Sequence, residues 1–397
     1  MGNQGRHKKM TFKTLFVALF LWIFVWNFNS AFASVPPAPQ PTPLKTIPQT
    51  PTITDPSDLL EYLVSIPNGE IDLLWSNLVI DKYINQKTDI EKTYRKVEAM
   101  AAVIRKMAGD NATDLEKIAA IRKYIYTAGY WNDNQPFTYD FDNPQGRLAI
   151  HKTLDYYLTN KKGNCVSMPL LFLVLAEQLD VDMSLITVPT HLQIRYTDPK
   201  TGRSVNLETT SGANPSRPEW LKTQLPWNDR AVETGMYLKT LTKQQMVAEM
   251  GTTILQRLYG EDKNWKEDIE VSVVILEVYP QSDIALLHIS KSTENELEDV
   301  YISKYPSISA MPSDAKNKAL SLMRMSDIAH QQLVHLGFKF KKRLQVDTPP
   351  NQFLQPNLRN APSNPALTLP HIQTPTFQRP NDPFGLNRFG TNQRMDN

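Results

Sequence analysis

The chain has 397 residues, of which 41% are hydrophobic, and a formal net charge of +2 at pH 7. This length allows two modest domains with tails, and the balanced charge excludes an electrostatic case for nucleic-acid binding. A single cysteine and scattered histidines give no metal-ligand spacing, and no glycine-rich phosphate loop is present, so we expect no cofactor and no metal.

The first 33 residues have the pattern of an export signal. Four basic residues precede an apolar run over residues 15–26, and Ala31-Phe32-Ala33 fits a cleavage site before Ser34. The run is shorter than the roughly 20 residues that a membrane span needs. We therefore expect residues 1–33 to be removed as a signal peptide, which changes the net charge from +2 to −2. The alternative is an uncleaved anchor.

Two segments of low complexity flank the part that should fold. Residues 34–56 are rich in Pro, Thr and Gln, which predicts an extended linker. Residues 346–397 are rich in Pro, Asn and Gln and cannot bury enough apolar area to become ordered.

Apolar residues at helical spacing predict helices between residues 57 and 128. One begins at Ser57 and ends near Pro67-Asn68-Gly69, the next covers residues 71–80, and a third covers residues 90–107. Thr113-Asp114-Leu115-Glu116 is a capping signal that predicts a helix over residues 112–128.

An aromatic and polar loop follows at residues 129–140. Such a loop either lines a substrate cleft or packs its own aromatic side chains on the surface, and both readings stay open. A further helix is predicted over residues 148–158. It carries His151, which we interpret as a surface or packing residue, and Tyr156 and Tyr157, which either reach the cleft or pack, with packing favoured.

The only cysteine stands before an apolar run, Leu170 to Leu179, that is typical of a buried helix. Gly163 and Asn164 are turn and cap residues, and Pro169 is tolerated only in the first helical turn. We therefore expect Cys165 at, or one residue inside, a helix N-terminus. There the helix dipole and free N–H groups favour a thiolate and could hold an oxyanion. The alternatives are a buried structural cysteine and, for Asn164, an oxyanion donor in place of a cap.

Two strand-like runs come next, at residues 183–196 and 204–210, with a turn signal between them. In a hairpin centred near Lys200, His191 faces the neighbourhood of Glu208 on the partner strand. The sequence thus supplies a nucleophile, an imidazole and a carboxylate in the arrangement of a catalytic triad. The hydroxyl groups after Glu208 either support its carboxylate or belong to a plain polar turn.

The order of helix-borne Cys, strand-borne His and strand-borne acid resembles the transglutaminase-like (papain-like) cysteine superfamily. The motifs that carry the resemblance are Gly163-Asn164-Cys165, Thr190-His191-Leu192 and Asn206-Leu207-Glu208-Thr209-Thr210. It covers residues 115–212 and is nearest to a bacterial branch with a tetratricopeptide-like helical tail.

The resemblance implies an α+β fold with a transglutaminase-like catalytic core, in which a helix-borne Cys packs on a small antiparallel sheet. It implies that Cys165 is the nucleophile, His191 the base and Glu208 the residue that orients the imidazole. The usual acid of the family is Asp, so Glu208 is a departure, and its longer side chain needs a slightly different strand offset.

After residue 229 the pattern is helical again. Helices are predicted over residues 231–241, 243–258, 265–279, 282–290 and 312–336. The break at Tyr279-Pro280-Gln281-Ser282-Asp283 is similar to the one between tetratricopeptide helices, and a plain helical bundle is the alternative. We expect two folded parts: a transglutaminase-like domain with N-terminal helices at 57–228 and a helical region at 229–337.

These observations lead to one expectation and one alternative. The first is an exported, periplasmic cysteine hydrolase or acyltransferase that acts on amide bonds of proteins or cell-wall peptides. The alternative is a catalytically idle envelope scaffold or peptide-binding protein. In either case we expect a protein partner to bind the C-terminal helices or tail. We expect no nucleic acid, and a membrane only if the signal is retained as an inner-membrane anchor facing the periplasm.

Overall fold

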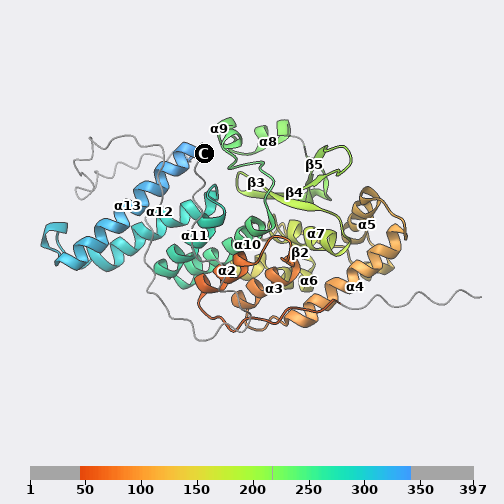
Figure 1. Cartoon of the computed structure of the whole chain (residues 1–397), viewed down its shortest axis with the longest axis horizontal. Helices are drawn as coiled ribbons and strands as arrows, with labels where there is room; N and C mark the ends of the chain where they lie inside the picture. The colour runs from red at the N-terminus through yellow and green to blue at the C-terminus, as the bar shows by residue number, and fades with distance from the viewer. Residues whose placement is uncertain (1–44, 217, 341–397) are drawn as a thin grey trace, which may run out of the picture. The chain divides into compact units, whose positions relative to one another are not determined.

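The computed structural model describes residues 45–216 and 218–340 (Figure 1). Residues 45–48, in the unit Met1–Pro48, form no helix or strand, and all elements below lie in the unit Gln49–Asn397. The predicted signal peptide, the first part of the linker and the C-terminal tail lie outside the described residues.

The N-terminal part folds into helices, as the apolar spacing predicts. They are α2 (Pro56–Ser65), α3 (Leu73–Ile84), α4 (Ile90–Ala108) and α5 (Asp114–Tyr126). Each begins at a side-chain cap, and Thr113 and Glu116 form the predicted capping box of α5. The caps satisfy N–H groups that have no partner within the first helical turn.

A small antiparallel sheet carries the hairpin. Its strands are β3 (Met183–Val188), β4 (His191–Thr197), β5 (Ser204–Glu208) and β6 (Asn214–Ser216), in the order β3-β4-β5-β6. Ile194 pairs with Leu207, so the predicted register of the hairpin is correct to within one residue. Helix α7 (Ser167–Gln178) packs on β3 and β4 and is buried on nearly all sides, which its unbroken apolar run explains.

The predicted helix over residues 148–158 is two elements. A 3-10 turn, η2 (Ala149–Lys152), is followed by α6 (Leu154–Asn160). Thr153 separates them because its backbone is extended and its side chain accepts a hydrogen bond from the N–H of Tyr156, as an N-cap does.

The C-terminal part is helical. Its elements are α8 (Pro218–Gln224), α9 (Asp229–Glu233), α10 (Lys243–Arg257), η4 (Leu258–Asp262), α11 (Trp265–Val278), α12 (Asp283–Leu297), η5 (Glu298–Ile302), η6 (Ile308–Ala310) and α13 (Ser313–Leu336). Helices α11, α12 and α13 pack in chain order, and Figure 1 shows α12 and α13 side by side. Helix α10 also packs on α2 and α3, so the predicted parts 57–228 and 229–337 touch closely. Their division, and the tetratricopeptide-like character, stay predictions.

The predicted helix over residues 231–241 is wrong beyond Glu233. Gly235 and Leu238 adopt left-handed backbone conformations, with φ of 75° and 59°. The N–H groups of Leu238 and Leu241 then donate to the carbonyls of Thr187 and Leu185 on β3, over 2.9 and 3.2 Å. The segment therefore satisfies its backbone on the sheet instead of within a helix.

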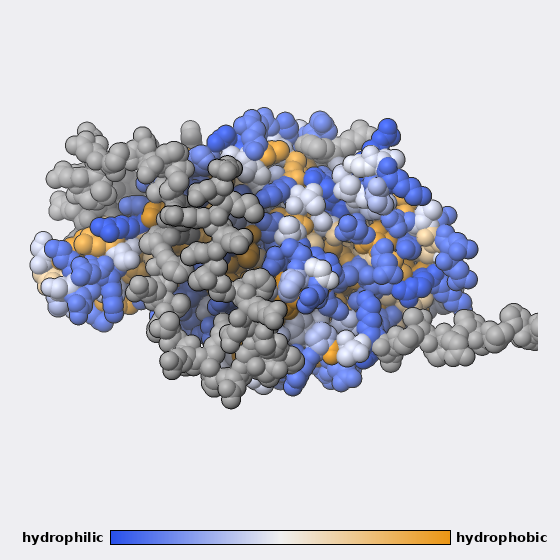
Figure 2. Space-filling view, in the orientation of Figure 1, coloured by the Kyte–Doolittle hydropathy of each residue, from blue (hydrophilic) through white to orange (hydrophobic). Residues whose placement is uncertain are grey.

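The face shown in Figure 2 is mostly hydrophilic among the described residues, as expected where apolar side chains fill the core. Over residues 45–216 and 218–340, no helix combines the length and apolar character that crossing a membrane requires.

Candidate active site

Cys165 lies in a turn that Asn164 builds. The Asn164 Oδ1 atom accepts hydrogen bonds from the N–H groups of Val166 (3.0 Å) and Ser167 (3.2 Å), and Ser167 Oγ accepts one from the N–H of Asn164 (3.1 Å). The first helical backbone bond runs from Met168 N to Asn164 O, so Cys165 occupies the first helical position although α7 is assigned from Ser167. The predicted placement of Cys165 and the capping role of Asn164 are confirmed.

A close contact under this turn explains the glycine before it. A Cβ atom added to Gly163 would lie 2.5 Å from the ring of Tyr157. Tyr157 is fully buried and packs edge-on against Phe137, with ring centroids 5.2 Å apart. Tyr157 is thus a packing residue, as predicted, and any larger side chain at 163 would displace the cysteine turn.

His151 and Tyr156 are also packing residues. His151 Nδ1 lies 2.8 Å from Asn143 Nδ2, and its ring packs edge-on against Tyr156 with centroids 5.1 Å apart.

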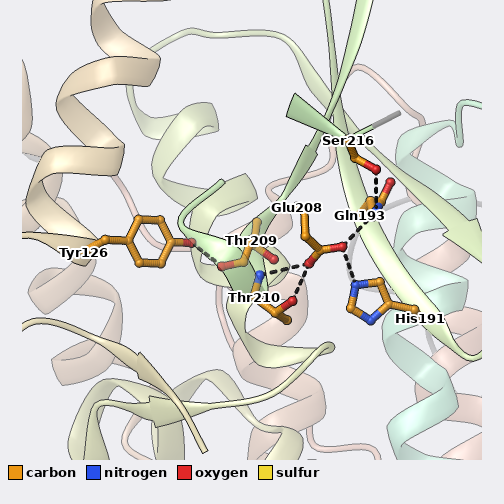
Figure 3. Close-up of polar contacts among 7 residues, drawn as sticks. All are labelled: Tyr126, His191, Gln193, Glu208, Thr209, Thr210 and Ser216. Atoms are coloured by element: carbon orange, nitrogen blue, oxygen red, sulfur yellow. Dashed lines mark hydrogen bonds and ion pairs between the residues drawn. The ribbon is translucent and has the colours of Figure 1, made fainter. Parts of the chain in front are cut away.

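Glu208, at the end of β5, is held on both carboxylate oxygens (Figure 3). Its Oε2 atom lies 2.8 Å from His191 Nε2 and accepts a hydrogen bond from Gln193 Nε2, also over 2.8 Å. Its Oε1 atom accepts from the N–H of Thr210 (3.0 Å) and from the Thr210 hydroxyl (2.5 Å). These contacts fix the carboxylate, so the longer Glu side chain reaches the imidazole without freedom to rotate.

The charged forms of His191 and Glu208 stabilise each other. Burial alone would raise the pKa of Glu208, but hydrogen bonds from His191, Thr210 and Gln193, together with the charge of His191, lower it. Burial lowers the pKa of His191, but hydrogen bonding and charge from Cys165 and Glu208 outweigh it and raise that pKa to about 9. His191 is therefore protonated at neutral pH, and because Glu208 engages Nε2, the nitrogen left for Cys165 is Nδ1.

The structure thus joins His191 to Glu208 directly, and Cys165 acts on His191 electrostatically. The residues that hold the Glu208 carboxylate were predicted only in part from the sequence. Thr210 was one of several hydroxyl residues after Glu208, whereas Gln193 was missed. Gln193 is fully buried and lies two residues after His191 on β4, so strand alternation places both side chains on one face and could have indicated it.

A second polar contact anchors the end of β5 to the N-terminal helices. The Tyr126 hydroxyl on α5 donates to the carbonyl of Thr209 over 2.9 Å (Figure 3). Because Thr209 follows Glu208 directly, this contact ties the acid of the site to α5.

The aromatic loop borders the site through a pair of short parallel strands. Strand β1 (Thr138–Tyr139) pairs with β2 (Lys162–Gly163), which ends one residue before Asn164-Cys165 begins the turn into α7. The pKa of Tyr139 is raised by burial and, to a smaller extent, by the charges of Cys165, Glu208 and Asp140. Tyr139 packs edge-on against Phe141, which is 84% exposed.

The start of the same loop packs on itself. Tyr130 meets Trp131 edge-on with centroids 5.1 Å apart, and Lys123 Nζ lies 5.0 Å from the centre of the Trp131 ring. This part of the loop therefore fits the interpretation in which the loop packs its own aromatic side chains, and a role in a substrate cleft stays a prediction.

Residues 91–250 match the family model of the transglutaminase-like superfamily. This part of the chain is a transglutaminase-like superfamily domain. It begins within α4, ends within α10 and contains the Cys165 turn and the whole four-stranded sheet. Searches of curated proteins and of solved structures gave no match.

In the described part of the transglutaminase-like domain and its flanking helices, no three His, Cys, Asp or Glu side chains cluster so that they could hold a metal ion.

Proposed function

We propose that this protein is an exported cysteine hydrolase or acyltransferase that acts on amide bonds of proteins or cell-wall peptides. In this proposal Cys165 is the nucleophile, His191 exchanges its proton and Glu208 orients the imidazole. One observation carries it: His191 Nε2 lies 2.8 Å from Glu208 Oε2, and Cys165 contributes with Glu208 to raising the pKa of His191 to about 9. An imidazolium beside a thiol at a helix start favours the thiolate.

The reaction follows from these positions. The Cys165 thiolate attacks the amide carbonyl carbon, the C–N bond breaks, and the protonated His191 gives its proton to the leaving amine. A thioester remains on the sulfur. Water or a second amine then attacks the thioester while His191 takes its proton, which releases an acid or a new amide and restores the thiolate.

The cysteine turn offers one backbone donor for the developing oxyanion. Asn164 Oδ1 already binds the N–H groups of Val166 and Ser167. Among the described residues, nothing accepts a hydrogen bond from the N–H of Cys165. That N–H is the donor we assign to the oxyanion, and a second donor would have to come from outside the turn.

Export, a periplasmic location and a protein partner at the C-terminal helices or tail belong to the same proposal. They rest on the sequence of residues 1–33 and on the helical region after residue 229. The substrate class follows from this location, since exposed proteins and wall peptides are the amides present there. A membrane enters only if the signal is retained.

The test is the rate at which iodoacetamide alkylates Cys165 across pH, in the purified protein and in His191→Ala. We expect the wild type to react at a lower pH than the variant, because the imidazolium stabilises the thiolate. Cys165→Ala is the control for other reactive groups. A screen for amide cleavage and amine incorporation would follow. An inert Cys165, or identical pH profiles, would contradict the proposal and favour the idle scaffold.

A further inference from the structure

The side chain of Gln193 connects three strands of the sheet. It lies on β4 two residues after His191, so both side chains are on one face of the sheet. Its Nε2 atom donates to Glu208 Oε2 on β5 over 2.8 Å and to Ser216 Oγ on β6 over 3.1 Å (Figure 3). The amide therefore joins the carboxylate that His191 binds to the next strand of the sheet.

The amide of Gln193 can bind Glu208 in one orientation. An ionised carboxylate accepts hydrogen bonds and donates none, so the amide nitrogen must face it. The amide oxygen, Oε1, is buried and has no hydrogen-bond partner among residues 45–216 and 218–340. A buried polar atom without a partner destabilises a fold. Stability alone would therefore favour an apolar side chain at this fully buried position, which points to a role for the amide nitrogen.

The two oxygens of Glu208 are held unequally. The N–H and the hydroxyl of Thr210 donate to Oε1 over 3.0 and 2.5 Å. Within the described ranges, Oε2 contacts His191 Nε2 and accepts one further hydrogen bond, from Gln193. A glutamate has one more rotatable side-chain bond than an aspartate, so its carboxylate needs more contacts to stay in one place. Gln193 supplies such a contact at the oxygen that faces the imidazole.

We propose that Gln193 is a positioning residue that holds Glu208 Oε2 against His191 and thereby lets a glutamate serve as the acid of the triad. The inference rests on the proposed function, because it takes His191 as the acid–base group. Gln193 acts through Glu208 and not on the substrate. Without its N–H the carboxylate is anchored at Oε1 alone, so Oε2 leaves the imidazole more often and stabilises the imidazolium less.

Ionisable side chains around Glu208 do not take the place of Gln193. Tyr126 on α5 and Tyr139 on β1 interact with Glu208 electrostatically, but burial raises the pKa of each above its ordinary value, so both are neutral near pH 7. The guanidinium of Arg122, also on α5, already binds Asn214 Oδ1 over 2.7 Å. The effect of removing the amide nitrogen should therefore be measurable.

The first variant is Gln193→Met, which keeps the length of the side chain and removes the donor. We expect the pKa of His191, followed by NMR of its imidazole, to fall by about 0.5 and iodoacetamide alkylation of Cys165 near pH 7 to slow about threefold. Near about pH 10 the alkylation rates should converge, because the thiolate forms there without the imidazolium.

The matched control is Gln178→Met, roughly 16 Å along α7 from Ser167. Gln178 is 5% exposed and, like Gln193, leaves one amide atom without a hydrogen-bond partner in the part of the chain that the structure describes. The control should change neither the pKa of His191 nor the alkylation rate.

A double-mutant cycle with Glu208→Gln tests whether Gln193 acts through the carboxylate. Glu208→Gln alone should slow alkylation about tenfold, and the addition of Gln193→Met should leave that rate nearly unchanged, because no carboxylate remains to be held. A residue that only supports the fold would multiply the two effects to about thirtyfold. That result would overturn the inference.

The outcomes separate this inference from the proposed function. If Gln193→Met equals the wild type in both measurements while His191→Ala slows alkylation, Gln193 has no positioning role and the proposed function stands. If His191→Ala leaves the pH profile unchanged, the proposed function fails and this inference fails with it. Thermal unfolding checks that each variant folds.

A measurement on the unsubstituted protein decides the question if Gln193→Met does not fold. With ¹⁵N-labelled glutamine, the side-chain amide resonance of Gln193 should move as Glu208 becomes protonated below its ordinary pKa of 4.5. An amide resonance that does not respond to this protonation would overturn the inference.

Discussion

Among residues 45–216 and 218–340, two histidines pair with carboxylates, one in the candidate active site and one between C-terminal helices. His191 Nε2 lies 2.8 Å from Glu208, and His288 Nδ1 on α12 lies 2.9 Å from Asp268 on α11. Both carboxylates are buried. Distance and burial alone therefore do not distinguish the pair we propose as catalytic from the other.

The difference lies in what each pair contacts next. Besides Glu208, Cys165 acts on the imidazole of His191 and contributes to raising its pKa. Beyond His288, the ring of Tyr259 packs edge-on at 5.3 Å, and Ser292 Oγ donates to Asp268 over 2.5 Å. Ser292 contacts the acid and not the imidazole, so the second pair activates no nucleophile and serves to join two helices.

The largest expected effect contrasts the two histidines. His191→Ala should slow alkylation and any amide turnover by roughly 10²- to 10⁴-fold, because the acid–base group is lost. His288→Ala should leave both rates within about twofold, since it contributes no proton transfer. Equal loss in the two variants would show that folding, not chemistry, is affected, and circular dichroism of each variant decides between them.

For the free energy of unfolding, we expect the larger effect at the second pair, His288 and Asp268. Asp268→Ala removes the carboxylate that both His288 and Ser292 bind, and we expect about 3–5 kcal/mol lower free energy of unfolding. Asp327→Ala, at an exposed position on α13, is the matched control and should change it by less than about 0.5 kcal/mol. Urea unfolding measures both, and an unchanged midpoint for Asp268→Ala would contradict the joining role.

The active-site pair should also make stability depend on pH. The pKa of His191 is raised from 6.5 to about 9, so its contribution is complete below about pH 6.5 and is lost as pH rises through 9. The difference in unfolding free energy between wild type and His191→Gln should therefore shrink by up to roughly 3 kcal/mol over this range. Urea unfolding at pH 6 and pH 9.5 tests this, and a constant difference would refute it.

Glu208→Gln keeps the shape of the acid and removes its charge. We expect about tenfold slower alkylation near pH 7, because the loss of the carboxylate lowers the pKa of His191 and weakens the imidazolium. Glu61→Gln, at an exposed position on α2, removes a carboxylate without changing the contacts of Glu208 and should not change the rate. A wild-type rate in Glu208→Gln would leave Glu208 without a part in the reaction.

We expect the smallest effect at Thr210, whose hydroxyl donates a hydrogen bond to the carboxylate of Glu208. Thr210→Val removes the hydroxyl that donates to Glu208 Oε1 but leaves the backbone N–H bond in place. We expect about 1 kcal/mol lower stability and an alkylation rate reduced less than fivefold. Thr210→Ser retains the hydroxyl and should restore both values; failure to do so would indicate that the methyl group matters instead.

The candidate site could be predicted because its signals are local. Asn164 before Cys165 indicates a capped helix start, and the turn near Lys200 sets the hairpin register that opposes His191 to the end of β5. The pair of Asp268 and His288 gave no such signal, because it joins two helix faces 20 residues apart with no motif between them.

One failure of the fold prediction has the same cause, a partner that lies far away in the sequence. The segment at residues 234–241 has apolar residues at helical spacing, yet Leu238 and Leu241 donate to β3, some 50 residues earlier in the chain. Periodicity cannot reveal a partner that distant. The break at Thr153 is different, since a threonine before the acidic first turn of α6 is a recognisable N-cap and could have been predicted.

The backbone hydrogen bonds from Leu238 and Leu241 also affect whether copies of the molecule can associate through the edge of the sheet. Strand β3 is at one end of the sheet order, where free carbonyls would be a template for a strand from another molecule. The carbonyls of Leu185 and Thr187 already accept hydrogen bonds from the chain itself. The β3 edge is therefore closed to the addition of a strand from another molecule. The segment at residues 234–241 thus protects this edge of the sheet against aggregation.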